Sequence, residues 1–296
     1  MTAQVPIRHM IDTGAVRICC HEWGAQHLGA APTMVLTHAT GFHGRCWDRV
    51  IAQLGPRHVV AVDLRGHGHS EAHPFDDWRD LADDLVAVLA DLGIEAALGI
   101  GHSVGGSVTL LAANKSLSCF ARLILIDPVL MPPEFYEQRV NPMAAPEGQM
   151  HPVARRKPEF DSLQDMQTLL SARPPYALFD HSVMEDYCRH GTETVDGKQR
   201  LRCTPEFEAS IYQSLLAYPD IPATIREVPQ PTLVVRTQQP RRPEDFRDFR
   251  FSPTDPGLAD RLPNGRDLLL PQFTHFLPQQ APEFCAGIIL AGENAF

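Results

Sequence analysis

One short stretch of the sequence holds a residue that could act as a nucleophile. Residues 101–105 read G-H-S-V-G, directly after the apolar run 97–100 and before a helical pattern that begins near Gly106. A tight turn from strand to helix strains its central residue, and it is tolerated when the residues two positions away lack a Cβ atom. The spacing therefore predicts that Ser103 presents its hydroxyl above a helix N-terminus, whose N–H groups stabilise an anion.

A dinucleotide-binding turn is the alternative for the same glycines. Gly99, Gly101 and Gly105 follow a strand pattern, and Asp127 ends the next strand pattern about 20 residues later, as in the Rossmann fingerprint. The third glycine of that fingerprint would stand at position 104, which is Val104. Two strand patterns also precede this unit, whereas the fingerprint normally opens its fold. The sequence therefore favours the exposed serine.

A serine nucleophile needs a base, and His275 is the candidate among the 14 histidines. It follows the strand pattern 268–270 by a short loop, near the end of the chain, where it can meet Ser103 across the top of a sheet. His67 and His69 could be taken for a metal-binding pair, but no carboxylate or cysteine at ligand spacing joins them. No metal site is predicted.

The elements that would position these residues follow a regular order. Short apolar runs recur, each followed by a loop and a helical pattern, which indicates a mostly parallel sheet covered by helices. The expected core strands are residues 33–37, 58–62, 97–100, 123–126, 232–236 and 268–270, with 16–20 as an early, antiparallel strand. Residues 78–92 are expected to form an amphipathic crossover helix, and residues 107–113 a helix packed tightly on the sheet.

The alternation of strands and helices stops at Pro132 and resumes near Pro222. The intervening chain is rich in Pro, Met and aromatic residues, and it contains helical patterns and no strand run. The helical patterns cover residues 159–172, 182–190 and 205–217. We therefore predict a core of residues 1–131 and 223–296 with a helical cap of residues 132–222.

The last helical pattern of the cap has one apolar stripe. Phe207, Ile211 and Leu215 recur at helical spacing after Thr204 and Pro205, a good N-cap and first-turn pair. The stripe could pack onto the core or contact a substrate, and the sequence leaves both roles open.

Three further segments, together with G-H-S-V-G, resemble the α/β-hydrolase superfamily over nearly the whole chain. Residues 38–42, H-A-T-G-F, are similar to its oxyanion loop, with Ala39 where Gly is usual. Residues 65–70, R-G-H-G-H-S, are similar to its R-G-x-G-x-S loop, and residues 274–277 to its histidine segment. The resemblance implies an α/β-hydrolase fold, with a mostly parallel central sheet, helices on both faces and a helical cap insertion.

The resemblance also implies roles for residues around Ser103. The backbone N–H groups of Thr40 and Val104 would form the oxyanion hole, since two donors from different loops must converge on one developing charge. Phe42 and His102 are expected to bind substrate, although His102 could instead be a packing residue behind the site. No cofactor is implied.

The acid of the triad departs from the usual superfamily pattern. After residues 232–236 the chain continues T-Q-Q-P-R-R, with no Asp or Glu within the expected reach. Asp127 ends the strand pattern 123–126, and in some superfamily members, haloalkane dehalogenases among them, the acid lies at the end of that strand. We favour Asp127, because a triad without its acid loses orders of magnitude in rate. An Asp before Pro128 is also a common turn residue, and Glu244 and Asp245 remain the alternatives.

Composition limits the class of partner. A net charge of −10 argues against a nucleic-acid surface, and no apolar run approaches the ~18 residues that cross a bilayer. The first 20 residues lack a secretory signal pattern, so a cytoplasmic location is expected. The seven cysteines, without CxxC spacing, are expected to be reduced and structural.

The sequence thus predicts a serine hydrolase that cleaves a carboxylic ester of a small, apolar substrate through an acyl-enzyme on Ser103. A lactonase, a C–C bond hydrolase or a cofactor-free perhydrolase would use the same triad. A non-catalytic small-molecule receptor on the same fold is the alternative from another class.

Overall fold

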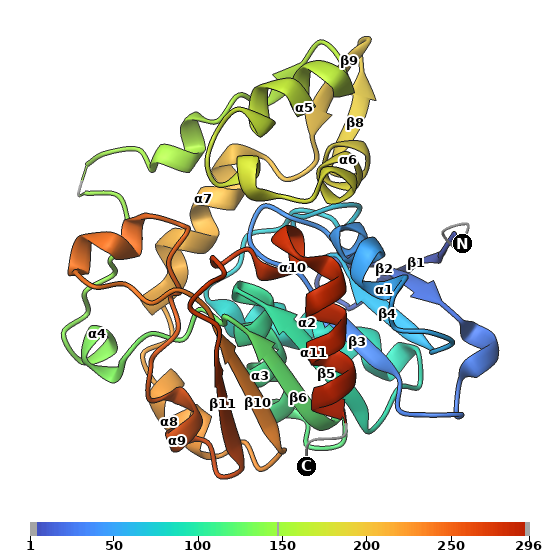
Figure 1. The fold of residues 1–296 in the computed structure, drawn as a ribbon, viewed down its shortest axis with the longest axis vertical. Helices are drawn as coiled ribbons and strands as arrows, with labels where there is room; N and C mark the ends of the chain where they lie inside the picture. The colour runs from blue at the N-terminus through green and yellow to red at the C-terminus, as the bar shows by residue number, and fades with distance from the viewer. Residues whose placement is uncertain (1–4, 147, 294–296) are drawn as a thin grey trace.

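A mostly parallel, eight-stranded sheet forms the centre of the molecule (Figure 1). The computed structural model describes residues 5–146 and 148–293, without the side chains of residues 243 and 244. In spatial order the strands are β1 (Ile7–Asp12), β2 (Arg17–Trp23), β4 (Val59–Val62), β3 (Met34–Thr37), β5 (Ala97–His102), β6 (Phe120–Ile126), β10 (Thr232–Arg236) and β11 (Gly265–Leu269). The pairs β1–β2 and β2–β4 are antiparallel, and the other neighbouring pairs are parallel.

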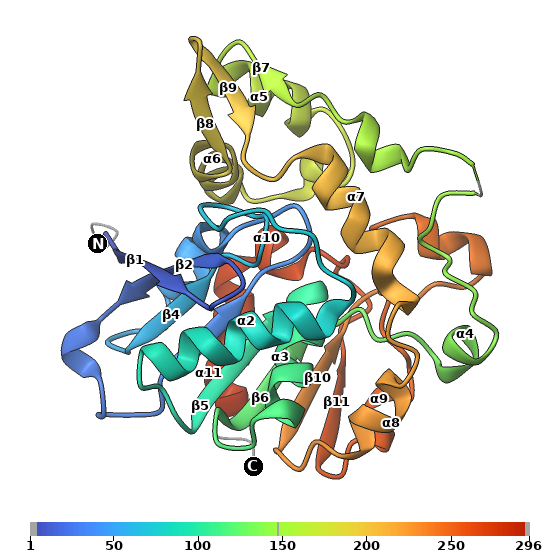
Figure 2. The same ribbon diagram turned by 180° about the vertical axis from the view of Figure 1, so that it is seen from behind.

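Helices cover both faces of the sheet, as Figures 1 and 2 show from opposite sides. One face carries α2 (Trp78–Asp91), α3 (Val104–Lys115), α8 (Ile221–Arg226) and α9 (Leu258–Arg261); the other carries α1 (Asp48–Ile51), α10 (Leu277–Gln280) and α11 (Pro282–Glu293). The predicted fold class is confirmed. No helix in the described part of the chain combines the length and apolarity that a membrane span requires.

The sheet separates the apolar core into two clusters, one on each face, because successive side chains of a strand point to opposite faces. In β3, Val35 packs with α2 and α3, whereas Met34 and Leu36 belong to the cluster under α11. All four residues of β3 are buried, which is typical of a parallel strand covered on both faces. The sheet is thus rigid where its carboxyl ends carry loops.

The cap contains helices, as expected, and also a second, three-stranded sheet, so the expectation that it holds no strand is wrong. Its strands β7 (Glu159–Phe160), β9 (Lys198–Leu201) and β8 (Thr192–Val195) pair antiparallel. These strands are short and mostly polar, T-E-T-V and K-Q-R-L in the hairpin, and leave no apolar run to detect. The turn Asp196-Gly197, with both φ values positive, is the hairpin signal that the sequence carries.

The helices of the cap are α4 (Pro133–Glu137), α5 (Leu163–Ser171), α6 (His181–His190) and α7 (Pro205–Gln213), with short 3-10 turns between them. Residues 159 and 160, expected in a helix, form β7 instead, and α5 begins after its N-cap Ser162. The predicted boundary at residue 222 falls inside α8, whose Ile221 and Ile225 are buried in the core cluster beside α3.

Helix α3 lies unusually close to β3, and Gly105 makes this possible. A Cβ atom at Gly105 would lie 2.6 Å from the carbonyl oxygens of Thr37 and His38, which are backbone atoms of the sheet and the loop that follows it. The first turn of α3 is therefore held against the carboxyl end of β3.

Replacing Gly105 by Ala is expected to lower the free energy of unfolding by about 1–3 kcal/mol or more, because the added methyl overlaps fixed backbone. Gly287→Ala is the matched control: Gly287 is an exposed glycine of α11 with nothing within 4 Å of a new Cβ. That change should stabilise the helix by up to about 1 kcal/mol. Chemical denaturation measures both, and equal stabilities of the two variants would contradict the close approach.

Candidate active site

Ser103 occupies the turn between β5 and α3, with φ of 58° and ψ of −126°. This strained backbone is possible because the residues two positions away on each side, Gly101 and Gly105, are glycines. A Cβ atom at Gly101 would lie 2.5 Å from the Cα atom of Gly106. The turn brings the hydroxyl of Ser103 to the wall of a cavity while its carbonyl accepts hydrogen bonds from the first turn of α3.

His275 lies between Ser103 and Asp127. Its Nε2 atom is 2.9 Å from the Ser103 hydroxyl oxygen, and its Nδ1 atom is 2.7 Å from Oδ2 of Asp127. A carboxylate can only accept here, so Nδ1 carries the proton and Nε2 is left to accept from the serine hydroxyl. The structure thus brings together the three residues predicted as a triad, in the order nucleophile, imidazole, carboxylate.

Asp127 is completely buried and accepts three further hydrogen bonds. The N–H and hydroxyl of Thr237 donate to its two oxygens at 2.9 and 2.8 Å, and the hydroxyl of Ser252 donates at 2.5 Å. Thr237 is the residue that directly follows β10. Asp127 has a φ of 48°, which turns its side chain at the end of β6.

Of the two alternative acids, Glu244 and Asp245, Asp245 has partners other than His275. The carboxylate of Asp245 accepts from the backbone N–H groups of Arg241 and Arg242, at 2.9 and 3.0 Å, and so caps its own 3-10 turn. The side chain of Glu244 lies outside the described residues. His275 therefore has Asp127 as its carboxylate partner among the described side chains.

The loop that follows β3 carries the predicted oxyanion donor Thr40. In the described part of the chain, the N–H groups of Thr40 and Val104 form no hydrogen bond with the protein, and both residues are buried. Thr40 and Ser103 line the same cavity, while Val104 begins α3 directly after Ser103. Two uncommitted donors beside a serine hydroxyl could bind a developing oxyanion.

Two buried histidines fix this loop. His67 accepts a hydrogen bond from the N–H of Gly41 through Nε2, at 3.0 Å, and donates through Nδ1 to the carbonyl of Arg65. His38 likewise accepts from the N–H of Leu64 at 2.9 Å. Burial lowers the pKa of His67 to about 4 and holds that of His38 well below its usual range. Both rings are therefore neutral near pH 7, as acceptors must be.

His102 lies behind the triad rather than on the cavity wall, so its predicted contact with substrate is not seen. It is fully buried, and its Nε2 atom is 2.7 Å from the backbone carbonyl of His275. Burial lowers its pKa to about 3, so the ring is neutral and donates through Nε2. His102 thus supports the loop of His275, the packing role that the sequence left open.

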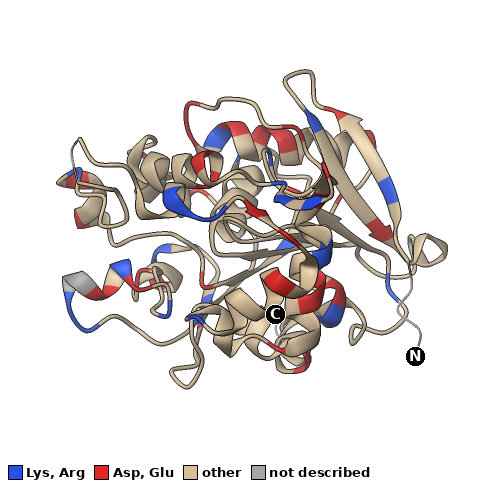
Figure 3. Ribbon diagram, turned by 90° about the horizontal axis from the view of Figure 1, so that it is seen from above, with Lys and Arg blue, Asp and Glu red and all other residues tan. Residues whose placement is uncertain are grey.

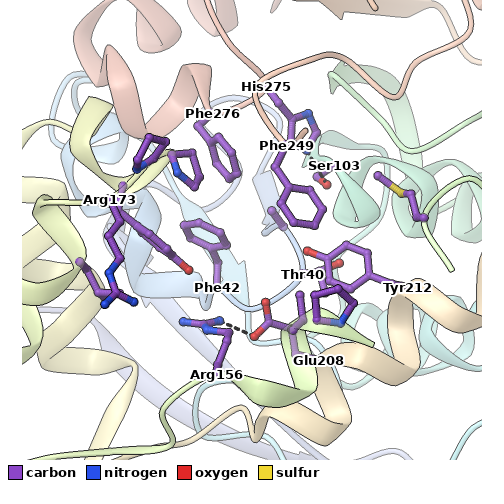
Figure 4. Close-up of a pocket in the computed structure, with 18 of the residues that line it drawn as sticks. Thr40, Phe42, Ser103, Arg156, Arg173, Glu208, Tyr212, Phe249, His275 and Phe276 are labelled. Atoms are coloured by element: carbon purple, nitrogen blue, oxygen red, sulfur yellow. Dashed lines mark hydrogen bonds and ion pairs between the residues drawn. The ribbon is translucent and has the colours of Figure 1, made fainter. Parts of the chain in front are cut away.

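The cavity beside Ser103 has a volume of about 320 Å³ and lies between the core and the cap (Figure 4). Its wall is largely apolar, and the predicted Phe42 faces it together with Phe249 and Phe276. A cavity of this size accommodates a small molecule with an apolar body.

The cap supplies cavity residues that the sequence did not reveal. Helix α7 turns Phe207 toward the core, where its ring packs on His67, and turns Glu208 and Tyr212 into the cavity. The apolar stripe therefore packs onto the core, and the residues between its members face the cavity. Glu208 forms an ion pair with Arg156, and burial raises the pKa of its carboxyl. In the sequence, the i, i+4 spacing of Glu208 and Tyr212 places both on one face of the helix, and this spacing was the signal that could have identified them.

Neither His67 nor His69 belongs to a group of potential metal ligands among the described residues, and both ring nitrogens of His67 already form hydrogen bonds. Two other groups of potential metal ligands occur among the described residues: Cys19, His21 and Asp63, and separately Asp48, Asp186 and His190. In both groups the carboxylates already have partners. Asp63 accepts from backbone N–H groups, and Asp48 and Asp186 pair with arginines.

Comparison with known proteins points to one family. The model of the alpha/beta hydrolase family matches residues 34–288. An esterase of Mycobacterium tuberculosis is 28% identical over 174 residues, 58% of this chain and 55% of the relative. The bifunctional esterase/perhydrolase DCH of Acinetobacter calcoaceticus is 24% identical over 282 residues, 90% of this chain and 92% of the relative.

The fold has close counterparts among solved structures. The crystal structure of E-2-(acetamidomethylene)succinate hydrolase aligns with a TM-score of 0.75 at 21% identity, over 98% of this chain and 99% of that chain. At this identity the likeness concerns the fold.

The neutral His67 generates a prediction about pH and stability. Its pKa is about 4 in the folded chain and near 6.5 when unfolded, so the unfolded state binds more protons between these values. Its contribution to stability is therefore lost as pH falls from about 6.5 to 4. His67→Gln should flatten the pH dependence of the unfolding free energy in this range, by up to about 1.4 kcal/mol per pH unit. Denaturant titrations at several pH values measure the slope, and an unchanged slope would contradict a neutral, buried His67.

Proposed function

Because the chain belongs to the alpha/beta hydrolase family, we propose that it is a serine hydrolase that cleaves a carboxylic ester of a small substrate with a largely apolar body. Ser103 is the nucleophile, His275 the general base and Asp127 the acid that orients His275. The single observation that carries the proposal is the chain of hydrogen bonds from the Ser103 hydroxyl through both nitrogens of His275 to Asp127, at 2.9 and 2.7 Å.

The first half of the reaction acylates the enzyme. The hydroxyl of Ser103 attacks the ester carbonyl while Nε2 of His275 takes its proton, so the oxygen becomes nucleophilic as it attacks. The carbonyl oxygen gains negative charge and is bound by the N–H groups of Thr40 and Val104. His275 then gives its proton to the leaving alcohol, and the acyl group stays on Ser103.

The second half releases the acid. Water takes the place of the alcohol, gives a proton to Nε2 of His275 and attacks the acyl carbon. The proton returns to Ser103 as the ester bond to the enzyme breaks. In both halves Asp127 holds Nδ1–H and stabilises the positive imidazolium, which keeps Nε2 directed at the reacting oxygen.

Several features of the cavity support a small ester as substrate. Its wall is mostly apolar, and Phe42, Phe249 and Phe276 surround the approach to Ser103 (Figure 4). Such a wall favours the body of an ester over a peptide chain, which would bring unpaired amide groups. Residues of the cap, Tyr176 and Tyr212 among them, form part of the cavity wall.

Ser103→Ala is expected to abolish hydrolysis of 4-nitrophenyl butyrate and labelling by a fluorophosphonate probe, because the attacking oxygen is removed while the fold is kept. The matched control is Ser118→Ala, at an exposed serine outside the cavity, which should react like wild type. Gel-based labelling and absorbance of nitrophenolate measure both. Labelling of the Ser103→Ala variant at the wild-type rate would overturn the assignment. A wild-type protein that neither hydrolyses esters nor takes the label would favour a receptor.

A further inference from the structure

The cavity beside Ser103 carries an excess of positive charge in an otherwise acidic chain. Three of its lining side chains are cationic, Arg156, Lys157 and Arg173, and Glu208 is the one acidic side chain among the described lining residues. The whole chain has a net charge of −10, and seen from above its Lys and Arg residues are interspersed with Asp and Glu (Figure 3). The excess of cations is therefore a local property of the cavity.

Arg156 is held in one position. Its guanidinium pairs with Glu208 from α7 and donates to the hydroxyl of Tyr187 from α6 at 2.9 Å. The Arg156 side chain is 19% exposed and that of Glu208 is 6% exposed, so the pair is largely removed from water. The charge of Glu208 balances one of the three cations, and two cations remain.

Neither remaining cation has a carboxylate partner among the described side chains. Within residues 5–146 and 148–293, the side chain of Arg173 has no hydrogen bond or ion pair, although it lines the cavity. The ammonium group of Lys157 lies 5.1 Å from the centre of the Phe160 ring, and it too has no carboxylate partner among these residues. A guanidinium without a partner at the wall of an apolar cavity is a ready site for an anion.

The cationic groups and the reacting serine lie at different sides of the cavity. In Figure 4, Arg173 is on the left and Ser103 on the right, with Phe42 and Phe276 between them, and Arg156 lies below beside Glu208. A molecule that reaches both sides must have an apolar middle and a negative group away from its ester.

We propose that the preferred substrate is an ester that carries a carboxylate, which Arg173 binds with the support of Lys157. This inference rests on the proposed ester hydrolysis and names its substrate class. The planar guanidinium of Arg173 can bind both oxygens of a carboxylate, and a carboxylate on a short carbon chain also supplies the apolar middle that the cavity requires. Phosphate is the alternative anion that the test must distinguish.

The test compares charged and neutral esters of similar shape. The 4-nitrophenyl hemiesters of succinic, glutaric and adipic acids are each paired with a neutral ester in which an ethyl group replaces the carboxylate. At least one hemiester should be hydrolysed with about tenfold higher kcat/KM than its neutral counterpart. Its KM should rise with ionic strength, since salt screens the attraction, whereas the KM of the neutral ester should not.

Arg173→Gln isolates the charge, because the exposed side chain has no described partner whose loss would unfold the protein. We expect it to lower the hemiester kcat/KM about tenfold, consistent with a hydrogen bond to a charged group, and to leave neutral esters within about twofold. Arg155→Gln is the matched control, at an exposed arginine next to Arg156 that does not line the cavity. This control should leave both substrates unchanged.

The hemiesters carry their carboxylate on the acyl side of the ester, so a binding measurement is needed to detect a site for a carboxylate on the alcohol side. Free dicarboxylates of four to eight carbons should inhibit neutral-ester hydrolysis more strongly than monocarboxylates of equal length, and Arg173→Gln should remove the difference. Calorimetry with Ser103→Ala measures the binding of the same dicarboxylates without turnover. This measurement tests the carboxylate site even if the protein proves not to hydrolyse esters. The inference is overturned if no hemiester is preferred and no dicarboxylate binds better, or if inorganic phosphate binds more tightly than every dicarboxylate.

Discussion

The arrangement of the site depends on one buried carboxylate, that of Asp127. A fully buried negative charge is costly unless several donors surround it, and Asp127 has four: His275, both donors of Thr237, and Ser252. Thr237 and Ser252 lie in the segment between β10 and α9, His275 lies in the loop after β11, and Asp127 itself follows β6. The requirement to satisfy one carboxylate therefore draws three loops together at the carboxyl edge of the sheet. The position of His275 above Ser103 follows from that convergence.

Three buried, neutral histidines support the loops around Ser103 and His275. His67 and His38 accept hydrogen bonds from backbone N–H groups, and His102 lies 2.7 Å from the carbonyl of His275. Burial keeps all three rings uncharged near pH 7 by lowering their pKa values. These hydrogen bonds tie the loop of residues 38–42 to the segment of residues 64–67, and the loop of His275 to His102. The motif R-G-H-G-H-S thus supports the proposed active site, although residues 65–70 do not line the cavity beside Ser103.

Sequence and structure agree where local rules are strong. The turn at Ser103 could be predicted because the crowded positions two residues away on each side accept only glycine. The parallel strands could be predicted because they are continuous apolar runs. The cap was predicted less well, since the strands β8 and β9 are polar and depend on a hairpin turn and on pairing with each other. The cavity charges were not predictable from the sequence, because Arg156 meets Glu208 only through the packing of α7 against the turn Pro152–Arg155, and Arg173 joins them only as a residue that lines the same cavity. Phe42 faces the cavity as expected, whereas His102 does not.

The central claim, that Asp127 orients His275, is tested most directly by kcat for Asp127→Asn and Asp245→Asn with one 4-nitrophenyl ester. An amide at position 127 keeps the shape but favours the wrong tautomer of His275 and cannot stabilise the imidazolium, so kcat should fall by roughly three to four orders of magnitude. Asp245→Asn should change kcat by less than about twofold, because that carboxylate caps its own turn. A mild effect at position 127 together with a severe effect at position 245 would contradict the account.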